Sequence, residues 1–108
     1  MASAIVVTPA SGSITHLSTV VSITATGAAA NTATGYDTTH YPTKPALNRY
    51  FQCVLAGQPT LKSHVFNSNA AGAAQWDGLV FPAAGSWTVS LRFASDDSQD
   101  ATATVVVA

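Results

Sequence analysis

Residues 86–93 alternate strictly between apolar and polar side chains, and this alternation limits the fold more than any other feature of the chain. The apolar positions are Trp87, Val89, Leu91 and Phe93, and the polar positions between them are Ser86, Thr88, Ser90 and Arg92. A period of two residues places alternate side chains on opposite faces of a β-strand, so one face can be buried while the other meets solvent. The pattern therefore predicts a half-buried strand over residues 86–93.

Further strands are predicted along the rest of the chain. The alternation recurs over residues 17–25, where one predicted face carries Leu17, Thr19, Val21, Ile23 and Ala25. The other predicted strands cover residues 4–8, 47–56, 61–66, 76–81 and 101–107. The Ala-rich stretches show no 3.6-residue apolar stripe of the kind that indicates a helix. About seven short strands separated by turn residues predict an all-β chain that forms an antiparallel β-sandwich, a single domain over residues 1–108.

Two segments carry a resemblance to a known family. Residues 81–97 begin with an apolar residue and Pro before a Gly, then an aromatic residue opens a strand, and a polar hairpin leads to the Thr/Val-rich run 101–107. Residues 5–14 read Ile-Val-Val-Thr-Pro-Ala-Ser-Gly-Ser-Ile. Together these segments resemble the last strands and the first strand of bacterial and phage immunoglobulin-like domains, a group that includes PKD-like and Big-like modules.

The chain also departs from that group at two positions. Trp76-Asp77-Gly78 is not followed by the Gly-Asp-Gly element of PKD modules, and Trp87 stands where the group more often has Tyr. The resemblance therefore implies an immunoglobulin-like sandwich rather than a PKD module in particular. Small domains of this kind recur as accessory proteins of phage particles, so the resemblance also implies a component of a virion.

Charge is unevenly distributed along the chain. Charged residues make up 8% of the sequence, against about 25% in a typical globular domain, and residues 1–36 contain none. A free soluble domain normally carries charges on its outer strand faces and edges. Either part of this surface is covered by self-association or by docking on a large assembly, or Ser and Thr hydroxyls alone keep it soluble. The net charge of −1 gives no electrostatic basis for binding nucleic acid or an anionic membrane.

Few residues could carry catalysis, so we expect a protein that is not an enzyme and needs no cofactor. The chain contains no Glu and no Gly-x-Ser-x-Gly nucleophile motif, and its ordinary bases are His16, His40 and His64. A small enzyme would require His40 or His64 in a cleft beside Ser or Asp. Cys53 is the single cysteine and alternates with Phe51 and Leu55, which predicts a small core residue and excludes an intrachain disulfide.

No metal site is expected, because the histidines and Cys53 lack the close spacing of zinc ligands. Asp96, Asp97 and Asp100 could approach a calcium ion together with Ser98, but a solvated polar turn is the favoured interpretation. Trp87 is predicted to be buried. For Trp76 a core position is favoured, and a surface position stays open.

The candidate partner contacts lie in two places. One is the loop at residues 35–45, where Pro and Tyr residues predict an ordered, extended segment; its candidate contact residues are Tyr36, His40, Tyr41, Pro42 and Lys44. The other is the uncharged first strand, represented by Ile5 and Val7.

These observations favour a structural or adhesion protein, either a capsid decoration (cement) protein of a bacteriophage or another small virion component. Its expected partner is the major capsid protein or another virion protein, and a homo-oligomer (dimer or trimer) is expected. The N-terminus lacks a basic region and its apolar run ends at Pro9, so synthesis in the host cytoplasm without a signal peptide is expected. The alternative is a carbohydrate- or host-cell-surface-binding module of the same fold, which would use exposed aromatic side chains.

Overall fold

The computed structural model describes residues 4–26, 36–37, 41–45, 48–67, 74–94 and 96–108, and these residues form ten strands and no helix. One antiparallel sheet, here the small sheet, has the strand order β1 (Ala4–Thr8), β2 (Val21–Thr26) and β8 (Ala74–Leu79). The large sheet has the order β10 (Gln99–Val107), β9 (Gly85–Phe93), β5 (Asn48–Val54) and β6 (Leu61–Lys62), and β7 (Phe66–Asn67) also pairs with β5. A separate hairpin joins β3 (Tyr36–Asp37) and β4 (Tyr41–Pro45).

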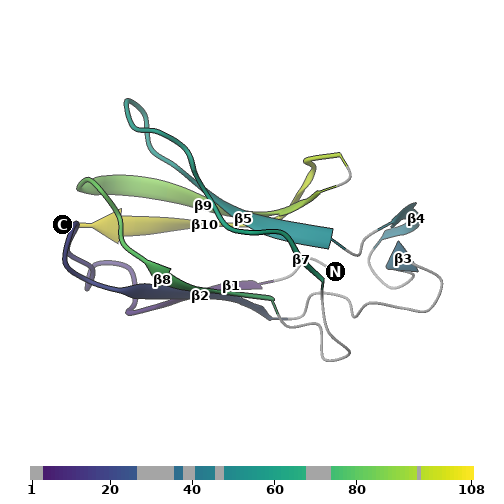
Figure 1. Ribbon diagram of the computed structural model, residues 1–108, viewed down its shortest axis with the longest axis horizontal. Coiled ribbons are helices and arrows are strands. Elements are labelled where there is room, and N and C mark those ends of the chain that lie inside the picture. Colours follow the sequence, from purple (N-terminus) through teal and green to yellow (C-terminus); the bar gives the residue numbers. More distant parts are fainter. Residues whose placement is uncertain (1–3, 27–35, 38–40, 46–47, 68–73, 95) are drawn as a thin grey trace.

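The two main sheets lie one above the other and share a hydrophobic core (Figure 1). The small sheet contributes Val21, Ile23, Ala25 and Leu79 to this core. The large sheet contributes Phe51, Cys53, Trp87, Val89, Leu91, Ala101, Val105 and Val107. The prediction of an all-β chain is confirmed for the described residues, and the two packed antiparallel sheets are compatible with the predicted sandwich. The immunoglobulin-like topology and the single domain stay predictions.

Strand β9 confirms the prediction drawn from the alternation over residues 86–93. Its inward side chains, from Trp87 to Phe93, are at most 1% exposed. The Trp87 indole N–H donates a hydrogen bond to the Ala83 carbonyl at 3.0 Å, and its ring lies 5.2 Å from the ring of Phe81. Trp87 therefore fills the core and also anchors the turn that precedes its own strand.

The predicted strand over residues 17–25 is wrong for its first four residues, because β2 begins only at Val21. Residues 15–19 form a turn in which the Thr15 amide donates to Thr19 Oγ1, and the Thr19 amide donates to the Thr15 carbonyl. Leu17 adopts a positive φ of 63° and is 70% exposed instead of facing the core. Hydroxyl side chains that bond to nearby backbone favour a turn over a strand, and period-two counting does not detect this competition.

The predicted strand over residues 61–66 is divided into β6 and β7. Ser63, which lies between them, donates its amide to the Phe51 carbonyl at 2.9 Å and accepts the Phe51 amide on its hydroxyl oxygen at 2.8 Å. The Ser63 side chain thus replaces a main-chain acceptor beside β5.

Residues 11–16 connect the small sheet to the large one. After β1 the chain crosses to β10, where the Gly12 amide donates to the Val106 carbonyl and Ile14 forms a parallel bridge with Val107. The His16 amide then donates to the Ala108 carbonyl at 2.9 Å. Ile14 is fully buried, so this crossing segment closes one end of the core as well as one end of the β10 edge.

We expect Trp87→Ala to lower the free energy of unfolding by about 3–5 kcal/mol, because it removes a fully buried ring and leaves a cavity. Trp87→Phe should lower the free energy of unfolding by less, because it keeps a ring against Phe81. It still loses the hydrogen bond to Ala83. Urea denaturation of both variants measures this order. A loss of less than about 1 kcal/mol for Trp87→Ala would contradict the core position.

Candidate functional site

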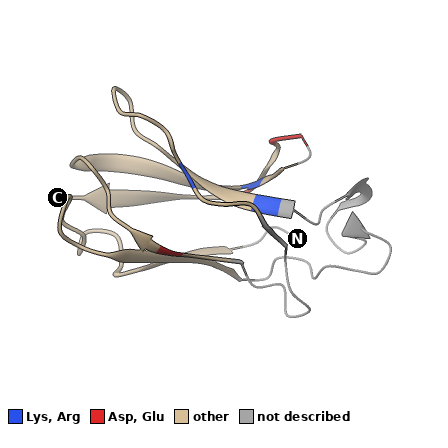
Figure 2. Cartoon of the chain, in the orientation of Figure 1, with Lys and Arg blue, Asp and Glu red and all other residues tan. Residues whose placement is uncertain are grey.

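Lys, Arg, Asp and Glu side chains are absent from one end of the described structure. Residues 9–20, 54–61, 79–91 and 101–108 contain no Asp, Glu, Lys or Arg. Figure 2 shows that the end bearing the C-terminus carries no described charge, whereas most charged side chains lie nearer the opposite end. The surface of the uncharged end is therefore formed by backbone groups and by apolar, hydroxyl, amide and imidazole side chains.

Exposed apolar side chains of this uncharged end lie beside the Val21–Leu79 pair, and we call three of them the end patch: Leu17, Val20 and Val80. Their exposed fractions are 70%, 64% and 38%. Val20 and Val80 each adjoin a member of the Val21–Leu79 pair of β2 and β8. The Leu17 amide donates to the Phe81 carbonyl at 2.9 Å, which holds Leu17 beside the same connection. Clustered exposed apolar side chains commonly mark an interaction surface.

The outer face of the small sheet is also poor in charge. Val6 is 45% exposed on β1, and the ionised group described on this sheet is the Asp77 carboxylate of β8. Asp77 accepts hydrogen bonds from Gln75 Nε2 at 2.8 and 3.0 Å and from Ser22 Oγ at 2.6 Å. These donors favour the ionised form and lower the pKa of Asp77. The carboxylate is thus already bound by neighbouring side chains of its own sheet.

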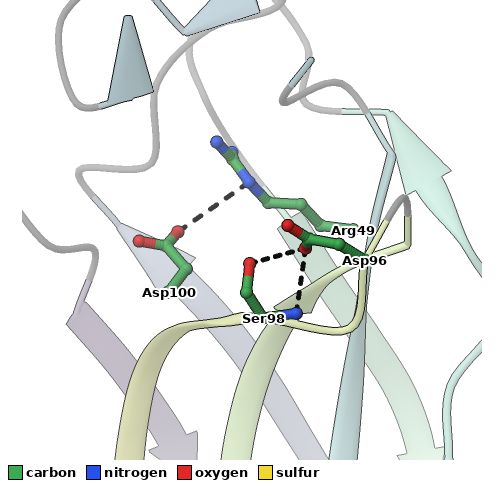
Figure 3. A network of polar contacts seen from close by, with 4 residues as sticks. All are labelled: Arg49, Asp96, Ser98 and Asp100. Atoms are coloured by element: carbon green, nitrogen blue, oxygen red, sulfur yellow. Dashed lines mark hydrogen bonds and ion pairs between the residues drawn. The ribbon is translucent and has the colours of Figure 1, made fainter. Parts of the chain in front are cut away.

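A polar network orders the turn between β9 and β10 (Figure 3). Arg49 Nε lies 3.8 Å from Asp100 Oδ2, and both side chains are buried. The Arg49 guanidinium carbon lies 4.9 Å from the centre of the Phe93 ring. Asp96 Oδ1 accepts the Ser98 amide at 3.0 Å and the Ser98 hydroxyl at 2.6 Å. The network links β5 to the last hairpin.

The interpretation of residues 96–100 as a solvated turn is correct for Asp96 and Asp97, which are exposed, and wrong for Asp100. The register between β10 and β9 shifts between Gln99 and Ala101. Asp100 and Ala101 are both buried as a result, with Asp100 facing Arg49. Among the described residues no group of His, Cys, Asp and Glu is arranged to hold a metal ion.

An open pocket of about 250 Å³ lies beside Tyr50 and the same turn, lined also by Lys62, Ser63, Val65, Ala94 and Asp97. The Tyr50 hydroxyl donates to Asp97 Oδ1 at 2.6 Å, and this bond, followed by burial, raises the pKa of Tyr50. The Lys62 ammonium lies 5.6 Å from the centre of the Tyr50 ring. Its volume lies below the range of about 300–1,000 Å³ of most small-molecule sites.

Of the candidate contact residues on the first strand, Ile5 and Val7 are half-buried and pack against the core. The residues of β1 that face outward are Ala4, Val6 and Thr8. All three central residues of β1 are β-branched and apolar, so its sequence gives no alternation from which the outward side could be read. Val6 is therefore the exposed residue that the sequence did not single out. Contact of Ile5 and Val7 with a partner stays a prediction.

The candidate contact residues of the loop gather on one hairpin. Tyr36 lies on β3, and Tyr41, Pro42 and Lys44 lie on β4. The backbone register pairs Tyr36 with Pro45 and Asp37 with Tyr41. His40 lies outside the described residues. The hairpin brings Tyr36 and Tyr41 onto adjacent strands at the end opposite the C-terminus (Figure 1).

The structure also shows the positions of the other residues that were considered for catalysis, metal binding or ring stacking. Trp76 is half-buried and packs against the core, which agrees with the favoured position. His16 Nδ1 lies 2.7 Å from the Ala108 carbonyl oxygen, whereas His64 is exposed. Cys53 is fully buried, as predicted, and burial raises the pKa of its thiol to about 12.

Comparison with known proteins adds no assignment. No protein-family model, curated protein or solved structure matches the chain. Within the described ranges, no helix has the length and hydropathy that a membrane span requires. The functional conclusion therefore depends on the geometry of the chain itself.

We expect the Cys53 thiol of the folded protein to react with Ellman's reagent only very slowly at pH of about 8, because the thiolate is the reactive form. Val54→Cys provides a matched control, since Val54 is the next residue of β5 and is 39% exposed. This variant should gain one fast-reacting thiol, while Cys53 should become reactive only in denaturant. Equal reaction rates for the two positions in the folded protein would contradict the burial of Cys53.

Tyr50 should make the stability of the protein sensitive to alkaline pH. Its pKa is raised above the ordinary value of 10.0 in the folded state, so its contribution to stability is complete below about pH 10 and is lost as the pH rises through the folded-state pKa. Urea denaturation at several pH values above neutrality should show a smaller alkaline loss of stability in Tyr50→Phe than in the wild type. Identical pH dependences would show that the folded state does not raise the pKa of Tyr50.

Proposed function

We propose that the chain is an immunoglobulin-like domain that acts as a structural or adhesion protein without enzymatic activity. Its role would be that of a phage capsid decoration (cement) protein, or of another small virion protein, that docks on the major capsid protein or another virion component. The observation that carries this proposal is the joint absence of charge and presence of exposed apolar side chains at one end of the described structure.

The arrangement of strands supports the immunoglobulin-like assignment. The orders β1-β2-β8 and β10-β9-β5-β6 correspond to the A-B-E and G-F-C-C′ orders of such domains. The parallel bridge between Ile14 and Val107 joins the segment that follows the first strand to the last strand of the other sheet. Trp87 bonds to the backbone four residues upstream, a contact analogous to the one a Tyr makes at this corner in immunoglobulin domains.

The end patch supports docking through shape and apolar contact. Burial of Leu17, Val20 and Val80 would remove exposed apolar surface from water, which favours association. The uncharged end also contains no ionised side chain whose desolvation would oppose contact. A surface of this composition suits the attachment of many copies of the chain to a protein shell.

The β3–β4 hairpin would supply a second contact, through Tyr36, Tyr41, Pro42 and Lys44. It lies at the opposite end from the end patch, so the two regions would address different neighbours (Figure 1). The alternative function, binding of a carbohydrate or host-cell surface, would also depend on this hairpin. Trp87 and Tyr50 are buried and Trp76 is half-buried, which leaves Tyr36 and Tyr41 as the remaining candidates for a stacking platform.

Mass spectrometry of density-purified particles tests the proposal. We expect the chain at a fixed ratio to the most abundant shell protein.

In a reconstitution with bare particles, Leu17→Asp and Val20→Asp should each weaken binding about tenfold, the equivalent of roughly 1.4 kcal/mol. Gln99→Asp, which adds the same charge at an exposed position of β10 outside the uncharged segments, is the matched control and should bind normally.

Tyr41→Ala examines the second contact and should weaken docking with little change in thermal stability. Absence of the chain from particles, with the protein left in the soluble fraction, would overturn the decoration role. Recovery of binding on a glycan array or on host cells would then favour the alternative. Binding to particles that is unchanged by both end-patch variants would show that the end patch is not the docking surface.

A further inference from the structure

Among the outer strands of the two main sheets, β6, β8 and β10 carry features that oppose pairing with another chain. Strand β8 includes Asp77 and a left-handed Gly78 (φ 76°), and its register with β2 shifts. Strand β6 is two residues long and includes Lys62. Strand β10 has a register shift near Gln99, and residues 11–16 cover its last residues. Short length, charge, irregularity and coverage are the usual means by which proteins protect sheet edges.

Strand β1 has none of these features. All five residues, from Ala4 to Thr8, pair in unbroken register with residues 26 to 22 of β2. The strand contains no charge and no glycine, and three of its residues are β-branched and apolar. Within the described part of the chain β1 pairs with β2 and with no other strand. Its outer edge is therefore a regular, uncharged row of backbone donors and acceptors.

We infer that β1 pairs antiparallel with β1 of a second copy of this chain, across a two-fold axis at Val6. Backbone groups along an edge are satisfied in full by another strand, which identifies the occupant as an extended segment. The pairing would join two three-stranded sheets into a continuous sheet of six strands with the order β8-β2-β1-β1-β2-β8. The arrangement is isologous, which is the commonest form of a homodimer.

The side chains of β1 match this arrangement. Across the two-fold axis Val6 faces Val6, Ile5 faces Val7, and Ala4 faces Thr8. The central pairs therefore join β-branched side chains of similar size. In an isologous pair every charged residue near the axis faces a like charge, and β1 and β2 contain none. The pairing would also cover the exposed parts of Ile5 and Val7, which are half-buried in the single copy.

One strand edge buries less surface than a standard interface of about 1,200–2,000 Å². The dimer is therefore a weak one whose population rises with concentration, as it would on a crowded surface. The inference does not depend on particle docking, because it concerns the purified chain alone.

Sedimentation velocity over a concentration series tests the inference. The wild type should show reversible dimerisation, and Val6→Lys should raise the dimer dissociation constant about fivefold or more, because like charges then face each other on paired strands. A mixture of Val6→Lys with Val6→Glu should dimerise more tightly than either variant alone. Thr102→Lys, an exposed substitution on the β10 edge strand, is the matched control and should dimerise as the wild type does.

Val6 is 45% exposed, so the single variants should remain folded by circular dichroism. Tighter dimerisation of the Lys–Glu mixture is a result that a merely destabilised strand does not give. A wild type that stays monomeric up to its solubility limit would overturn the inference. So would a dimer unaffected by Val6→Lys, or one weakened equally by Thr102→Lys.

Discussion

The hydrogen bonds between residues 12–16 and residues 106–108 are the constraint on which the rest of the structure depends. They bring the first segment of the chain across from the small sheet to the last strand of the large sheet. This crossing sets the position of the turn that presents Leu17, and it covers the end of β10. It also ends β1 at Thr8, so that β1 is an edge strand that pairs with β2 alone among the described strands.

Arg49 and Asp100 show that the scarcity of charge is not uniform across the molecule. The chain has nine Lys, Arg, Asp and Glu residues, from counts of 4 and 5, yet two of them form a buried pair. Desolvation of two ions offsets much of their attraction, so such a pair contributes more to a defined arrangement than to stability. Here the arrangement is the position of the last hairpin against β5, with the Phe93 ring beside the guanidinium.

The sequence was most informative where apolar and polar residues alternate, as in β9, because burial of one face is then the dominant energy. Prediction failed at Leu17, where side-chain hydroxyls bond to the backbone and form a turn instead of extending the strand. It also failed for Asp100, whose burial depends on a register shift and on Arg49, which lies 51 positions earlier in the sequence. For β1 the successive apolar residues concealed which side faces outward, so Val6 was identified only from the fold.

The uncharged end has a consequence for the conditions under which it could hold a partner. Ionic strength weakens contacts between exposed charges because mobile ions screen them over distances of about 10 Å at 0.1 M salt. The segments that carry Leu17, Val20 and Val80 contain no Lys, Arg, Asp or Glu side chain whose charge could be screened. Adhesion through this end should therefore persist through changes of salinity, and strongly hydrated anions such as sulfate should tighten it. Attachment of this kind suits a protein that must stay in place while its surroundings change.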